Sequence, residues 1–325
     1  MRTHKLLRML AGAALGWLSV STIPSHAQSY PSKPVRIVVP LSPGGGTDLV
    51  VRLVAQKMSE QAGTQFIVEN RPGAGTVIGT EFVSRAAPDG YVLGAAAPEI
   101  VINPTLRKLP YDTVKDFICV TQLTSGQYFL STHPSVPVRS VQQFVALAKS
   151  RPGEMTYGSS GRGSANHLAG MWLQQLTGTK LIHVPYKGGG PANAALLSGE
   201  TDFMFSNTAS AIGHVKAGRL RAVASTGTRR SALAPDVPTV AESGIPQFVV
   251  TGFYLLLAPA GTPSAVIAKL NAESAKALAA PAVSSRLAEL GQDPVGGTAD
   301  ACAALIKAEI AKWAPLVKAS GAAAQ

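Results

Sequence analysis

Three glycine-rich loops hold most of the polar groups in this sequence that are placed to bind a ligand. The first is Pro43-Gly44-Gly45-Gly46-Thr47-Asp48, the second runs from Arg71 to Thr76, and the third is Gly158 to Ser164, with His167 just after it. Each loop follows an apolar run and precedes a helical pattern, so its backbone N–H groups open the next helix. Such groups bind anions. A carboxylate, phosphate or sulfate is therefore the ligand class that these loops predict.

A purely structural explanation competes with this one, because glycine also permits the positive φ of a tight strand-to-helix turn. For any single loop the two explanations are equally good, and three loops of one kind favour a shared anion site. Asp48 is interpreted first as a helix cap, with ligand contact as the alternative. His167 is interpreted first as a hydrogen-bonding residue at a helix end, with a role as base or ligand contact as the alternative.

The same loops do not match the sequence motifs of common enzyme classes. The run from Gly73 to Gly79 places its last glycine one residue too far along for a dinucleotide fingerprint, and Gly161-Arg162-Gly163 is followed by Asn166 where the third glycine belongs. There is no phosphate-binding P-loop, no HExxH and no nucleophile elbow. The six histidines are not clustered as metal ligands. We therefore expect no catalytic residue, no metal and no cofactor. A hydrolase or lyase that uses Ser159 or Ser160 with His167 is the alternative, and it needs a third group to orient the histidine.

The N-terminus has the pattern of an export signal. Arg2, Lys5 and Arg8 precede an apolar stretch from Met9 to Val20, and Ser25-His26-Ala27 forms a small-x-small cleavage site. Because a bilayer span needs about 20 apolar residues, this stretch is too short to cross a membrane. We expect residues 1–27 to be a cleaved signal peptide and the protein to be periplasmic; a retained anchor is the alternative.

The overall charge points to a small anionic partner. Lys and Arg number 29 against 18 Asp and Glu, a formal net charge of +11. The basic residues are scattered and form no run of five or six, so nucleic acid is not an expected partner.

The two cysteines, Cys119 and Cys302, lie in a chain expected to reach an oxidising compartment, where they could pair. Cys302 also falls on the helical stripe Cys302, Ile306, Ile310 and Trp313, which is typical of a core. We therefore favour two buried free thiols over a disulfide.

The elements around the loops alternate between strand and helix. Strands are expected at residues 35–40, 66–69 and 91–96, and again at 156–157, 181–184, 201–205, 221–225 and 253–258. Ser140 and Gln143 form a capping box, and Thr262-Pro263 opens a late helix with proline at its first position. Alternation of this kind is typical of parallel α/β sheets. Two such series predict two lobes with a cleft between them.

Several long blocks of the sequence resemble a known family. They are YPSKPVRIVVPLSPGGGTDL, VENRPGAGTVIGTEFVSRAAPDGYVL, YGSSGRGSANHLAG, VPYKGGGPANAALLSGETDFMF and LLLAPAGTP, in this order along the chain. They are similar to the tripartite tricarboxylate transporter receptors, also called Bug-type or TctC-like solute-binding proteins. The resemblance implies a type II-like periplasmic binding fold, α/β, with two mostly parallel sheets and a ligand cleft between the lobes.

The resemblance also implies a division of the chain. Strand crossovers are expected near Thr121 to Phe129 and Phe248 to Gly252. The first lobe would comprise residues 28–122 plus 252–325, and the second lobe residues 123–251.

The family holds its ligand's carboxylate with backbone N–H groups, hydroxyls and bridging waters from both lobes. The matching positions here are Pro43, Gly44, Gly45, Gly46, Thr47, Asp48, Ala74, Gly75, Thr76, Ala97, Pro98, Ser159, Ser160, Gly163, Ser164, Ala165, His167 and Asn207. Two features depart from the family pattern. Arg162 either clamps a second carboxylate or points into solvent, and Leu41-Ser42-Pro43 lacks the aromatic residue often found there.

The expected function is that of a monomeric receptor that closes around a small carboxylate and delivers it to membrane permease subunits. A sensor that reports the ligand without transport is a further alternative. Dicarboxylates, tricarboxylates, acidic amino acids, aromatic acids and small neutral vitamins all stay open as ligands, with aromatic residues at 6% slightly disfavouring large aromatic acids.

Overall fold

The computed structural model describes residues 30–319, so the signal peptide expected at residues 1–27 lies outside the described part. The first series of strands forms a parallel unit in which β1 pairs with both β2 and β3. The elements of this unit are β1 (Val35–Val39), α1 (Gly46–Ala62), β2 (Phe66–Asn70), the short 3₁₀ turn η1 (Ala74–Thr76), α2 (Val77–Ser84), β3 (Val92–Ala96) and α3 (Glu99–Leu106). Strand β1 is almost wholly buried, as its run of valines and isoleucine predicts. Helix α3, which begins directly after Ala97-Pro98, was not expected from the sequence.

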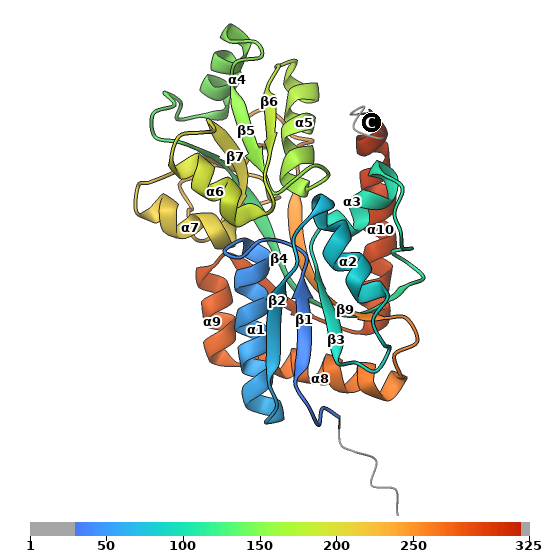
Figure 1. The fold of residues 1–325 in the computed structure, drawn as a ribbon. Helices are drawn as coiled ribbons and strands as arrows, with labels where there is room; N and C mark the ends of the chain where they lie inside the picture. Colours follow the sequence, from blue (N-terminus) through green and yellow to red (C-terminus); the bar gives the residue numbers. More distant parts are fainter. Residues whose placement is uncertain (1–29, 320–325) are drawn as a thin grey trace, which may run out of the picture.

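The second series forms another parallel unit, with β5 between β6 and β7. Its elements are α4 (Val141–Ser150), β5 (Thr156–Ser159), α5 (Ala165–Thr177), β6 (Ile182–Pro185), α6 (Gly189–Leu197), β7 (Phe203–Asn207), α7 (Thr208–Lys216) and β8 (Arg221–Ser225). Half of the capping box before α4 is present, because the Ser140 hydroxyl accepts a hydrogen bond from the Gln143 N–H at 3.1 Å. The Gln143 side chain accepts from the Arg139 N–H at 2.7 Å and not from that of Ser140. In Figure 1 this unit lies above the first one.

A single long strand, β4 (Phe117–Thr132), joins the two units. Its first part pairs antiparallel with β9 (Thr251–Pro259) and β10 (Gln292–Gly296), and its last part pairs antiparallel with β7 and β8. The resulting mixed sheet has the order β2-β1-β3-β9-β4-β7-β5-β6. We call the unit around β1, β2, β3 and β9 the first lobe and the unit around β5, β6, β7 and β8 the second lobe (Figure 1). The two-lobed α/β fold expected from the sequence is confirmed.

The C-terminal helices return to the first lobe. They are α8 (Ser264–Ala279), α9 (Pro281–Glu289) and α10 (Ala299–Ala319). Helix α8 packs on α1, while α10 packs on α3 and β4 (Figure 1). Pro263 stands just before α8, as its N-cap, and not at the first helical position that the sequence predicts. Within residues 30–319, no helix combines the length and the apolar character that crossing a membrane requires.

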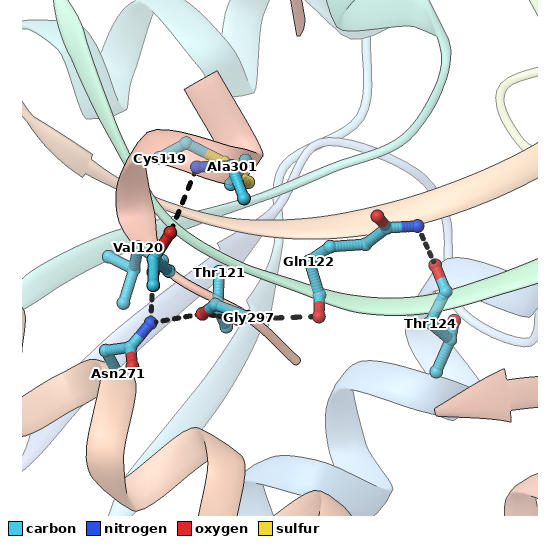
Figure 2. The surroundings of a disulfide bond; sticks show 10 residues. Cys119, Val120, Thr121, Gln122, Thr124, Asn271, Gly297 and Ala301 are labelled. Carbon is cyan, nitrogen blue, oxygen red and sulfur yellow. Dashed lines mark hydrogen bonds between the residues drawn. A yellow bond between two sulfur atoms is a disulfide. The ribbon is translucent and has the colours of Figure 1, made fainter. Parts of the chain in front are cut away.

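The prediction of two free thiols is wrong, because Cys119 of β4 and Cys302 of α10 form a disulfide. The apolar stripe that suggested burial is real, with Cys302 exposed by 3% and Trp313 by 1%. Burial and pairing do not exclude each other here, since the stripe faces β4 and brings the two Cα atoms to 5.7 Å, a normal disulfide spacing. Figure 2 shows the polar contacts beside the bond, where the Asn271 side chain donates to the carbonyl groups of Val120 and Gly297.

Candidate functional site

A small cavity of about 40 Å³ lies between the two lobes. It exceeds the space of roughly 10–15 Å³ that the centre of one water molecule requires. Its wall from the first lobe consists of Leu41, Ser42, Gly45, Gly46, Thr47, Asp48, Ala97, Pro98, Glu99 and Tyr254, and β4 adds Tyr128. Its wall from the second lobe consists of Ser160, Ala165, Asn166, Gly189, Met204, Asn207 and Ser210.

Five helices begin at this cavity. Helix α1 starts at Gly46, α3 at Glu99, α5 at Ala165 and α6 at Gly189, while Asn207 is the N-cap of α7. Each N-terminus has a partial positive charge and free N–H groups. None of the described residues in the wall is a lysine, arginine or histidine. The attraction for an anion therefore comes from backbone dipoles of both lobes.

The glycine loops of the two lobes touch each other at the edge of the cavity. Both the backbone N–H and the hydroxyl of Ser42 donate to the Lys187 carbonyl, at 3.1 Å and 2.7 Å. A Cβ atom on Gly45 would lie 3.3 Å from the Gly189 nitrogen, and one on Gly46 would overlap the Tyr254 hydroxyl and the Asn207 side-chain oxygen. The absence of side chains at these positions lets the lobes meet.

Half of the positions predicted for the site lie in the cavity wall. These are Gly45, Gly46, Thr47, Asp48, Ala97, Pro98, Ser160, Ala165 and Asn207. The other predicted positions lie outside the wall: Pro43, Gly44, Ala74, Gly75, Thr76, Ser159, Gly163, Ser164 and His167.

The second glycine loop contacts the other lobe next to the cavity. The Arg107 guanidinium donates to the carbonyl groups of Ala74, at 3.0 Å, and of Arg162, at 2.9 Å. Asn103 donates to the Gly75 carbonyl at 2.9 Å. The Arg162 side chain is exposed and lies outside the wall, which fits the solvent-facing alternative.

Asp48 is not the N-cap of α1, the role that its position predicted, but its carboxylate holds the chain just ahead of the helix. One carboxylate oxygen accepts from the Gly44 N–H at 3.0 Å, and the other accepts from Arg52 at 2.9 Å and Asn70 at 3.0 Å. The N-cap residue itself is Gly45, and Asp48 reaches back to the chain ahead of it. Although Asp48 lies in the wall, its charge is already matched by Arg52.

The third loop is held by its own side chains. Ser164 caps α5 by accepting from the His167 N–H, and the His167 ring nitrogen Nδ1 accepts from the Gly163 N–H at 3.1 Å. The helix-end role favoured for His167 is therefore observed. Its ring stacks on His183, with centroids 3.9 Å apart. Burial, together with nearby Arg162 and Arg107, lowers the pKa of His167 to about 4.

A serine–histidine pair exists, but with a different histidine from the one that the sequence suggested. The Ser159 hydroxyl lies 2.6 Å from Nε2 of His183. Burial, then His167 and Arg162, lower the pKa of His183 to about 3. Ser159 has an exposure of 0% and lies outside the cavity wall. Its oxygen is thus shielded from any ligand in the cavity.

Sequence reasoning missed several residues of the wall, above all Tyr128, Tyr254 and Glu99. The tyrosines lie inside long strands, where nothing in the pattern marks them. Glu99 is an acid directly after a buried strand and Ala97-Pro98, a signal that could have been used. It is exposed by only 5%, and burial raises the pKa of its carboxyl group above the usual range. One oxygen accepts from the Ser160 hydroxyl at 3.3 Å, and the other has no hydrogen-bond partner among the described residues.

Comparison with known proteins agrees with this geometry. Residues 50–322 match the family model described as tripartite tricarboxylate transporter family receptor. The protein BugT of Bordetella pertussis is 36% identical over 302 residues, which cover 92% of this chain and 93% of BugT.

Two solved structures extend the similarity to the fold. The periplasmic binding protein BugD superposes with a TM-score of 0.88 at 33% identity, covering 91% of this chain and 100% of BugD. Rpa4515 of R. palustris, solved with adipate, superposes with a TM-score of 0.87 at 33% identity, covering 90% of this chain and 98% of the other. The cavity between two lobes, the five helix N-termini and these matches lead to one conclusion: this chain belongs to the tripartite tricarboxylate transporter receptor family.

Proposed function

We propose that this protein captures a small carboxylate in the cavity between its lobes and delivers it to the membrane permease subunits of a tripartite tricarboxylate-type transporter. The convergence of five helix N-termini on a cavity without basic side chains is the observation that carries this proposal. The adipate held by Rpa4515 supports the same ligand class.

We infer that the ligand acts by stabilising the closed arrangement. Contacts from both lobes exist only when the lobes meet, so a ligand that uses both shifts the equilibrium towards closure. The lobes in this proposal comprise residues 28–122 plus 252–325 and residues 123–251. The chain enters the second lobe through β4, and the connection back runs beside it, where the Thr226 hydroxyl donates to the Val250 carbonyl and accepts from the Tyr128 N–H.

The proposal places the protein in the periplasm as a monomer without catalytic activity. The family is one of receptors, and its solved relative BugD is a periplasmic binding protein. The buried position of Ser159 argues against a serine nucleophile, because a substrate in the cavity does not reach its oxygen.

Thermal unfolding in the presence of small carboxylates tests the proposal. The purified protein is first unfolded and refolded, which removes any bound ligand. A carboxylate at about 100 times its dissociation constant should add about 2.7 kcal/mol to the free energy of unfolding, which raises Tm by several degrees. Mass spectrometry should recover the same acid unchanged. No response to any carboxylate, or conversion of the acid to a product, would contradict the proposal.

A further inference from the structure

Glu99 lies where the two lobes meet. It is the first residue of α3 in the first lobe, whereas the hydroxyl that donates to one of its carboxyl oxygens, at 3.3 Å, belongs to Ser160 of the second lobe. Glu99 is exposed by only 5%, and its other oxygen has no hydrogen-bond partner among the described residues. Because the cavity wall around it is built from both lobes, the burial of this side chain depends on how the lobes meet.

No basic side chain in the cavity neutralises this carboxyl group. The described residues of the wall include no lysine, arginine or histidine. The other acid of the wall, Asp48, already pairs with Arg52. The titratable groups that interact electrostatically around Glu99 are all acidic, namely Tyr128, Tyr254 and Glu309.

The basic groups of the neighbouring elements are engaged elsewhere. They are Arg107, which donates to two carbonyl groups at the other end of α3, Lys312, which pairs with Glu309 on α10, and Arg162, whose side chain is exposed. His167, in the first turn of α5, is neutral at pH 7 because its pKa is about 4. Glu99 therefore has no fixed counter-charge.

A carboxyl group in these surroundings changes its protonation when the lobes separate. With the lobes together, burial raises the pKa of Glu99 above the usual range, which favours the neutral acid. With the lobes apart, water reaches the side chain, and a hydrated glutamate has a pKa of about 4.3, so it is ionised at neutral pH. The N-terminus of α3 favours the ionised form in both arrangements, so it does not cancel the difference.

A bound carboxylate increases this difference. The cavity measures only about 40 Å³, so an anion inside it lies close to Glu99 with no basic side chain of the wall between the two. A like charge at short range disfavours the ionised form of a carboxyl group. Binding of an anion and protonation of Glu99 therefore favour each other.

We propose that Glu99 takes up one proton from solvent when the lobes close on a carboxylate, so that capture of the ligand is linked to uptake of a proton. This inference rests on the proposed function and adds a pH-sensitive switch to it. The proton returns to solvent when the lobes reopen. Because the closed arrangement holds this proton more tightly than the open one, affinity for the ligand falls as the pH rises.

Titration calorimetry in buffers of different ionisation enthalpy tests the inference, because it counts the protons taken up on binding. The probes are succinate, adipate and malate, which are ionised at pH 7 and so do not take up the proton themselves. At pH 7 the refolded protein should take up close to one proton for each acid that it binds. Its Kd should increase as the pH is raised from 6.5 to 7.5.

The variant Glu99→Gln should abolish the proton uptake, because the amide keeps the shape of the neutral acid and does not titrate. Its Kd should be the same from pH 6.5 to 7.5, and at pH 7.5 it should bind at least as tightly as the unaltered protein. Glu273→Gln is the matched control. Glu273 is a buried carboxylate in α8, paired with Lys269 at 2.8 Å and outside the cavity wall, and its substitution should leave the proton uptake unchanged.

Three results would overturn the inference. Binding of an acid by the unaltered protein without proton uptake would overturn it while leaving the carboxylate receptor intact, and this measurement needs no variant. Undiminished proton uptake in Glu99→Gln would assign the proton to another group. Failure of every carboxylate to bind would overturn both this inference and the proposed function.

Discussion

Because Gly46 has no side chain, the start of α1 packs directly against the second lobe. The Tyr254 hydroxyl and the Asn207 side-chain oxygen occupy the space that a Cβ atom would need. Tyr254 lies in the first lobe with Gly46, whereas Asn207 lies in the second lobe, so only the contact with Asn207 depends on how the lobes meet.

The variant Gly46→Ala should weaken ligand binding by at least tenfold, because its methyl group collides with Asn207 when the lobes close. Because the Tyr254 hydroxyl lies in the same lobe as Gly46, the methyl group also displaces that side chain, and thermal unfolding of the variant must first establish that it is folded. Gly213→Ala in α7 is the control, because nothing lies within 4 Å of its Cβ position, and its Kd should match that of the unaltered protein. Calorimetry on both variants checks this, and equal affinities for the two would show that closure tolerates a side chain at position 46.

The stacked histidines make stability depend on pH. The pKa values of about 4 for His167 and about 3 for His183 lie below the value of about 6.5 for an unfolded histidine. Below pH 6.5 the unfolded chain therefore binds protons that the folded protein does not. The free energy of unfolding should fall between pH 7 and pH 5, by up to about 1.4 kcal/mol per pH unit for each histidine.

Urea unfolding at pH 7, 6 and 5 measures this slope. His183→Gln should reduce the slope, whereas His133→Gln should leave it unchanged, because His133 hydrogen-bonds Ser135 at the surface, away from the stack. A slope that stays the same in His183→Gln would remove His183 from the explanation.

Residue types predicted part of the site and left another part hidden. The run Gly45-Gly46-Thr47-Asp48 could be found because glycine before a helix has a recognisable purpose, and all four residues lie in the wall. Tyr128 and Tyr254 could not be found, because a buried tyrosine in a strand looks the same whether it borders a cavity or a core. Ser164 and His167 stand next to the wall residues Ala165 and Asn166 in the sequence. Their polar atoms nevertheless form hydrogen bonds within the third loop itself.

At the level of elements, the parallel strands were predictable and β4 was not. Strands such as β1 are short and apolar apart from Arg36, whereas β4 contains Thr121, Gln122, Ser125 and Gln127 among its apolar residues. These polar side chains reflect partners that change along the strand, from β9 and β10 to β7 and β8. Only the similarity to a known family suggested a crossover there, and helix α3, which contains Pro104, had no such guide.

The disulfide connects two of these elements, β4 and α10, across 183 residues of sequence. The double variant Cys119→Ala/Cys302→Ala should lose about 2–5 kcal/mol of stability, because the cross-link restricts the unfolded chain. Its Tm should drop by several degrees and become insensitive to reductant, whereas reductant should lower the Tm of the unaltered protein. An unchanged Tm in the double variant would show that α10 stays docked through its apolar stripe alone.

For the whole molecule, the two series of strands and helices in the sequence predicted two lobes. They did not predict how the two lobes contact each other. Closure depends on contacts such as Ser42 with Lys187 and Arg107 with Arg162, which join residues far apart in the chain. No local pattern encodes such pairs, because each residue is ordinary in its own segment.

The late return of the chain to the first lobe has a consequence for the order of folding. Strand β3 lacks its neighbour on one side until β9 exists, and β9 begins only at Thr251. The second lobe is continuous and can condense as soon as it has been synthesised, whereas β1, β2 and β3 must wait for the last quarter of the chain. Pairings so distant in sequence form slowly. A newly made chain therefore has an incomplete sheet and an open strand edge until β9 is made, and in that state it is vulnerable to aggregation.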